Sequence, residues 1–284
     1  MRRCVSQAYV QIEVLRSLLG IWLFGALLRR ELLAVTGHIY KFIESCDSGI
    51  HRWWKSARLE FLTMANLIVF MTVNFALPAS NVVFATDAQG ANDADAEDHG
   101  GYGIVAANLS DSQKRVLWRS SFTPGYSICK LDGSLGRKFQ DKQNLSPTIP
   151  FTRLPPFLFK LDWTELASGR WAYGDHITAG EARAHWRCLQ ALGACSKAHS
   201  QRYVLLQDNF PVAASMSKGR ATAPLLLYYC RRRCGTALAA ELMSAVPWVQ
   251  TALQPADDAS RQKSSRPGDG GQGAHGPAAT GPTC

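Results

Sequence analysis

The sequence predicts an α/β protein whose central sheet is mixed, has about five strands and carries helices on both faces, preceded by a helical N-terminal segment. Three observations lead to this prediction. Apolar residues recur at helical spacing before Pro78, short segments rich in β-branched and aromatic residues follow it, and helix-like segments separate the later strands. Strands that alternate with helices are typical of an α/β sheet.

The composition is that of a folded protein with polyanionic partners. The chain has 284 residues, 46% hydrophobic and 19% charged, which is enough to bury a core. A formal net charge of +9 favours nucleic acid or an anionic membrane surface as the partner. The eight cysteines are widely and irregularly spaced, so we expect reduced thiols in an intracellular protein, with nucleus or cytoplasm left open.

The N-terminal part is predicted to be helical over residues 10–45 and 57–77. Residues 61–86 carry no charge, which raises the alternative of a membrane span. Asn66, Asn74 and Pro78 interrupt this run, so a buried helix followed by a buried strand is the better interpretation. We therefore expect no membrane partner.

The remainder is predicted as a sheet domain over residues 81–261. Residues 81–87 and 101–107 are expected to pair as a hairpin. Thr178 and Glu181 have the spacing of a capping box at the start of a helix. The other predicted segments are an irregular insertion at about 120–170, a strand at 171–174, a helix at 178–195, a strand at 202–208, a helix at 222–246, a strand at 248–253 and a disordered tail at 262–284.

The acidic stretch between the two hairpin strands first suggests calcium. A calcium loop that begins at Asp93 needs glycine at its sixth position and glutamate at its twelfth, but Asp98 and Ile104 stand there. We therefore interpret Asp93, Asp95, Glu97 and Asp98 as a solvated hairpin loop.

Basic residues at two places are candidates for contacts with phosphates. Arg231, Arg232 and Arg233 form a run within one predicted helix, and the competing interpretation is a solvated helix face. Lys218 and Arg220 lie in SMSKGR, whose glycine spacing does not match a phosphate-binding loop.

Four acids stand at the ends of predicted elements. Asp87 and Asp208 each end a strand, Glu181 begins a helix, and Asp257 follows the last strand. Carboxylates at such positions can converge on one edge of a sheet. Together they would repel one another without cations, and their hard oxygen ligands suit Mg²⁺ or Mn²⁺. Two such ions about 3.5–4 Å apart form the clamp used in phosphodiester hydrolysis.

These motifs resemble the ribonuclease H domain of retroelement reverse transcriptases, most of all those of DIRS-type retrotransposons. The matching segments are VVFATDAQG with GGYGIV, HITAGEARA, LLQDN and ADDASR, in that order. The resemblance implies a ribonuclease H-like fold, with metal-binding and catalytic roles for Asp87, Glu181, Asp208 and Asp257. Asp258 is the fallback for the fourth position.

Residues 1–80 are similar to the helical connection that precedes ribonuclease H in such elements. The sequence also departs from the family. Gln89 stands where a small residue is common, the 120–170 stretch is long, and no aromatic-x-Asp-Asp polymerase motif is present. We therefore expect a retroelement-derived chain that lacks the polymerase core, with an upstream polymerase domain as a possible partner.

The resemblance implies hydrolysis of the RNA strand of an RNA–DNA hybrid by a two-metal mechanism that uses Mg²⁺ or Mn²⁺. The alternative is a catalytically inactive remnant that still binds nucleic acid. A membrane-anchored protein built around residues 61–86 is a more distant alternative.

Overall fold

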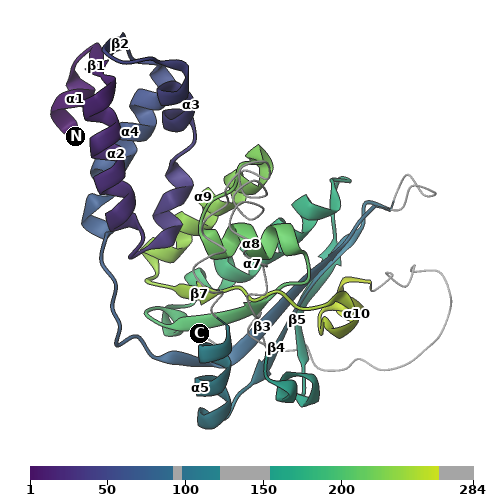
Figure 1. Ribbon diagram of the computed structural model, residues 1–284. Coiled ribbons are helices and arrows are strands. Elements are labelled where there is room, and N and C mark those ends of the chain that lie inside the picture. The colour runs from purple at the N-terminus through teal and green to yellow at the C-terminus, as the bar shows by residue number, and fades with distance from the viewer. Residues whose placement is uncertain (92–97, 122–153, 262–284) are drawn as a thin grey trace, which may run out of the picture.

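The computed structural model describes residues 1–91, 98–121 and 154–261, and its centre is a five-stranded mixed sheet (Figure 1). The strand order is β5-β4-β3-β6-β7, with β4 antiparallel to β3 and β5, and β6 parallel to β3 and β7. The strands are β3 (Ala79–Gln89), β4 (Gly101–Asn108), β5 (Thr164–Arg170), β6 (Arg202–Leu206) and β7 (Met243–Ala245). The predicted α/β class with a mixed five-stranded sheet and flanking helices is confirmed.

The β3–β4 hairpin forms the middle of the sheet, as its β-branched and apolar sequence predicts. Asp87 pairs with Gly103 in the ladder. Successive side chains of a strand point to opposite faces, and β3 is buried on both. Val83 lies in one apolar cluster and Phe84 in another.

Helices cover the two faces of the sheet (Figure 1). One face packs against α7, whose Leu189 joins the cluster of Phe84. The opposite face carries Leu117 of α5, Leu158 of η4 and Ala259 of α10. The elements named here are α5 (Asp111–Ser120), η4 (Pro156–Lys160), α7 (Ile177–Ala194) and α10 (Asp257–Ser260).

The chain before β3 consists of short helices and a small β1–β2 sheet, and it packs against α8 (Phe210–Lys218) and α9 (Pro224–Ala239). Its elements are α1 (Arg2–Ser6), β1 (Tyr9–Gln11), α2 (Ile12–Ala26), η1 (Arg30–Val35), α3 (His38–Ser45), β2 (Ile50–Arg52), α4 (Lys55–Leu67) and η2 (Ile68–Phe70). No described helix is long and apolar enough to cross a membrane. The division at residue 80 stays a prediction.

The two long N-terminal helices predicted from apolar spacing are wrong in extent. The first is divided into α2, η1 and α3, and the second ends at Leu67. The break after α2 turns the chain so that Arg29 can donate to backbone carbonyls of Ala237 and Leu242, far along the sequence. A tertiary contact therefore outweighs local helix propensity here.

Three predictions in the second half also need correction. β5 lies inside the stretch predicted to be irregular, and residues 171–174 follow it without forming a strand. α9 ends at Ala239 because Glu241 takes a positive φ of 51°, and β7 follows. Residues 248–253 form one bridge, from Trp248 to Gln207, and η6 (Thr251–Leu253) rather than a strand.

Some predictions lie outside the described residues. They concern Asp93, Asp95 and Glu97, most of the 120–170 insertion, and the tail from residue 262. Asp98 is described, and its Oδ1 accepts a hydrogen bond from the backbone N–H of Gly100 and lies 3.3 Å from Arg170 Nη1. This acid therefore stabilises the end of the hairpin loop.

Candidate metal centre

Three of the four predicted acids come together at one edge of the sheet. Asp87 lies near the end of β3, Asp208 just beyond β6, and Glu181 in the second turn of α7. One carboxylate oxygen from each can be chosen so that all three lie within 4.8 Å of one another. Adjacent parallel strands end at the same edge, so β3 and β6 bring two of these acids together.

Small residues let α7 carry Glu181 close to β3. A Cβ atom on Gly180 would lie 3.3 Å from the Cβ of Ala88, so little space remains between helix and strand. The capping box predicted at Thr178 is wrong, because His176 is the cap and its Nδ1 accepts from the Thr178 N–H at 3.2 Å. Glu181 is therefore free of a capping role.

A glutamine next to Asp208 orients Glu181. Gln207 Nε2 donates to Glu181 Oε2 at 2.7 Å, and Gln207 Oε1 accepts from Thr86 Oγ1 at 3.1 Å. All three side chains are buried. Sequence reasoning missed Gln207, although a polar residue within the apolar strand RYVLLQD was a visible signal.

A second neighbour acts on Asp87. Ser260 Oγ of α10 donates to Asp87 Oδ2. This contact depends on Gly103, which pairs with Asp87, because a Cβ there would lie 2.6 Å from the backbone N of Ser260. The glycines of GGYGIV thus make room for α10 over the strand. Ser260 belongs to the ADDASR motif, but its role was not predicted.

Burial and mutual repulsion raise the pKa of two of the acids. The pKa of Asp87 rises to about 7, mainly because the carboxylate is desolvated, with repulsion from Asp208 and Asp257 adding to the shift. The pKa of Glu181 rises to about 9, again through desolvation first and then repulsion from Asp87 and Asp208. Ser260 and Gln207 oppose these shifts only in part.

The residues present fit a divalent cation. The acids line a cleft of about 450 Å³. Asp208 Oδ1 is buried there without a hydrogen-bond partner among the described residues. Carboxylate oxygens are hard ligands of the kind that Mg²⁺ and Mn²⁺ prefer. The cluster can therefore hold a metal ion, whose identity the residues alone leave open.

The fourth predicted acid stands apart from this group. Asp257 lines the same cleft, but it is not among the carboxylates that converge within 4.8 Å. Its Oδ1 lies 2.8 Å from Arg261 Nη2. Its role as a metal ligand stays a prediction, and Asp258 is exposed.

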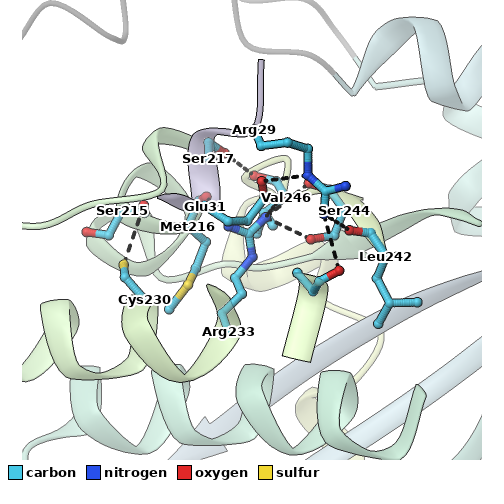
Figure 2. A network of polar contacts seen from close by, with 11 residues as sticks. Arg29, Glu31, Ser215, Met216, Ser217, Cys230, Arg233, Leu242, Ser244 and Val246 are labelled. Atoms are coloured by element: carbon cyan, nitrogen blue, oxygen red, sulfur yellow. Dashed lines mark hydrogen bonds and ion pairs between the residues drawn. The ribbon is translucent and has the colours of Figure 1, made fainter. Parts of the chain in front are cut away.

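The structure contradicts the prediction that Arg233 binds nucleic acid. Its side chain is only 3% exposed, and its Nη2 lies 3.3 Å from Glu31 Oε1 (Figure 2). Nη1 donates to the carbonyl of Met216, and Nη2 donates to Ser244 Oγ. Arg233 therefore joins α9 to η1 and α8 inside the protein and is too deeply buried to contact a phosphate backbone.

The other basic candidates differ in the contacts that their side chains make within the protein. Arg231 is exposed, but it donates to Glu60 Oε1 at 2.7 Å and to the backbone carbonyl of Ala34, so its guanidinium is held in a structural contact. Arg232 and Arg220 are exposed, with Arg232 over the rings of Trp186 and Tyr228 and Arg220 over Tyr40. Binding of nucleic acid by Arg220, Arg231, Arg232 and Lys218 stays a prediction.

Comparisons with known proteins do not show to which family the chain belongs. No protein-family model matches the chain, and no curated protein matches it. A solved structure of a foamy viral protease-reverse transcriptase in complex with an RNA/DNA hybrid aligns with a TM-score of 0.26 and 9% sequence identity. The match covers 88% of this chain and 48% of that one, so the chain spans about half the length of that protein. A similarity at this level establishes neither a shared fold nor a shared function.

Proposed function

We propose that this protein is a retroelement-derived ribonuclease H that hydrolyses the RNA strand of RNA–DNA hybrids with two divalent cations, Mg²⁺ or Mn²⁺. One observation carries the proposal: Asp87, Glu181 and Asp208 converge within 4.8 Å in an open cleft. The order of their motifs resembles that of the ribonuclease H family, and this resemblance is the reason to assign RNA-strand hydrolysis to the site.

Each residue would contribute in its own way. Asp87, Glu181 and Asp208 would hold the cations, with Asp257 as the fourth ligand at the rim of the cleft. Gln207 would keep Glu181 in one orientation, and Ser260 would do the same for Asp87. When bound, a pair of divalent cations supplies an activated water and stabilises the charge on the leaving 3′ oxygen.

The substrate class follows from charge and shape. A net charge of +9 favours a polyanion, and exposed residues such as Arg220 and Arg232 would contact its backbone. The 2′-hydroxyl groups and the A-form-like geometry of a hybrid would let the protein distinguish RNA from DNA.

A cleavage assay on a labelled RNA–DNA hybrid with Mg²⁺ or Mn²⁺ tests the proposal. We expect Asp87→Asn to lower the rate by more than about a hundredfold, since changing even a neighbour of a metal ligand costs up to about that much. The matched control Asp162→Asn alters an exposed aspartate that does not line the cleft and should cleave like the wild type. Equal cleavage by the wild type and Asp87→Asn would sink the catalytic assignment.

The same assay identifies the alternative. Asp257 pairs with Arg261 and stands apart from the other three acids, which is what an incomplete site would look like. If no protein cleaves while the wild type still binds the hybrid in a filter-binding assay, the chain is an inactive nucleic-acid-binding remnant.

A further inference from the structure

A second pocket lies where the chain before β3 meets α8, α9 and β7. Its volume is about 200 Å³, and its lining includes residues 27–31 and 243–246. It shares no lining residue with the cleft of the acid cluster. Three arginines and one glutamate line this pocket, which gives it a formal charge of +2. These residues are Arg29, Arg30, Arg233 and Glu31.

Arg29 lines this pocket with donors that the protein does not use. The residue is only 7% exposed, and its Nη2 donates to the backbone carbonyls of Ala237 and Leu242. Its Nη1 makes no hydrogen bond with a described residue. Its Nε is buried without a hydrogen bond, since Glu31 Oε2 lies 3.7 Å away. Buried donors normally have an acceptor, so the pocket is suited to a ligand that brings one.

Two further arginines make the same pocket positive. Arg233 uses both of its terminal nitrogens within the protein, and its Nε is buried without an acceptor among the described residues. Glu31 is the carboxylate that Arg29 and Arg233 share (Figure 2). Arg30 lines the pocket without a hydrogen bond or ion pair from its side chain to a described residue. Even where Glu31 and helix-end carbonyls offset the two buried arginines, the charge of Arg30 stays without a partner.

We propose that this pocket binds a small oxyanion, of which inorganic phosphate is the simplest. Guanidinium groups match the oxygens of phosphate well, because their N–H donors are fixed in one plane. Ser244 Oγ accepts from Arg233 Nη2, which leaves its own hydrogen available for the anion. The volume is below the about 300–1,000 Å³ of sites that hold drug-sized ligands, so it favours a small ion over a nucleotide.

The bound anion would join parts of the chain that are far apart in the sequence. Residues 27–31 belong to the chain before β3, whereas Arg233 and Ser244 follow the sheet's β6 strand. A ligand that binds only the folded protein stabilises it. The inference does not depend on the acid cluster, because the two sites have no residue in common.

Thermal unfolding and calorimetric titration with sodium phosphate, in the presence of a chelator, test the pocket. Sodium chloride at the same ionic strength is the reference, because it screens surface charges equally. We expect phosphate to raise Tm above the chloride value and to saturate as a single site. Sulfate, which has a similar shape, should compete with phosphate.

Substitutions locate the site. Arg30→Gln removes a charge without breaking a described side-chain contact, and we expect it to weaken phosphate binding about tenfold or more. Ser244→Ala removes a hydroxyl donor and should weaken binding about two- to tenfold. Arg52→Gln, at an exposed arginine of β2 outside the lining, is the matched control and should bind like the wild type. Circular dichroism checks that each variant is folded.

Three results would overturn the proposal. The first is that phosphate stabilises the wild type no more than chloride does. The second is phosphate binding that Arg30→Gln and Ser244→Ala both leave unchanged. The third is that adenosine 5′-monophosphate binds more tightly than phosphate and loses this binding in Arg30→Gln, because the pocket would then hold a nucleotide.

Discussion

This protein has two buried groups of charged side chains. In the first, arginines are paired with a glutamate, whereas in the second three acids lie together without a cationic partner among the described residues. In the arginine network, the guanidinium groups of Arg29 and Arg233 share Glu31 (Figure 2). They also donate to carbonyls in the last turns of α8 and α9, each of which carries about half a negative charge. The two guanidinium groups are thus paired with one carboxylate and with the carbonyl ends of two helices within the protein.

The acid cluster has no such balance. Asp87, Glu181 and Asp208 form no ion pair with a described lysine or arginine. The donors that reach the first two, which are Ser260, Gln207 and the backbone N–H of Ala88, are neutral, and only the more distant Arg261 lowers the pKa of Asp87. Burial first, and then repulsion between the acids, raises the pKa values of Asp87 and Glu181. Buried ion pairs such as that of Glu31 and Arg233 serve the structure, whereas buried carboxylates with raised pKa values in a cleft are typical of functional sites.

The largest effect is expected from breaking the balanced network. Glu31→Gln would leave two buried guanidinium groups without their carboxylate, so we expect the free energy of unfolding to fall by about 3–5 kcal/mol. Equilibrium unfolding in urea measures this loss. The control Glu44→Gln, at an exposed glutamate, should change stability by about 0.5 kcal/mol or less. Similar values for both variants would refute the role of Glu31.

A smaller loss of stability is expected from displacing α10, which lies beside the acid cluster. Gly103→Ala would place a Cβ 2.6 Å from the backbone N of Ser260, so we expect a loss of about 1–3 kcal/mol from overpacking. Gly235→Ala, on the open side of α9, is the matched control and should gain about 0.5–1 kcal/mol. Hybrid cleavage should fall only in the first variant, because only there does Ser260 move from Asp87.

The smallest expected effect is a pH dependence of stability that arises from the acid cluster. The pKa values of Asp87 and Glu181 are raised to about 7 and about 9, so above their ordinary values near 4 the folded protein holds more protons than the unfolded chain. Without metal, stability should therefore fall as the pH rises from about 5 to about 9. Thermal unfolding of Asp87→Asn should show a shallower fall. Identical slopes for both proteins would contradict the raised pKa of Asp87.

The sequence predicted the parts of this protein that depend on local pattern. Asp87, Asp208 and Glu181 could be predicted because each lies near the boundary of an element with a clear apolar pattern. The β3–β4 hairpin was found for the same reason. Predictions of this kind depend only on residues that are close in the sequence.

The parts that were missed depend on residues far apart in the chain. Arg233 was taken for a surface residue because its partner, Glu31, lies 202 positions away. Gln207 and Ser260 act on acids 26 and 173 positions away, which spacing within a motif does not reveal. β5 was missed because TELASGR is polar and contains one β-branched residue, as suits a strand at the exposed edge of the sheet.

The central claim, that the unbalanced acid cluster binds divalent cations, is tested most directly by calorimetric titration with Mn²⁺ near neutral pH. Two buffers that differ in ionisation enthalpy reveal the protons released. We predict that the wild type binds Mn²⁺ and releases about one proton or more, because Asp87 and Glu181 must lose the protons that their raised pKa values retain. Asp87→Asn should bind far more weakly. Absence of binding by the wild type, or undiminished binding by Asp87→Asn, would contradict the claim.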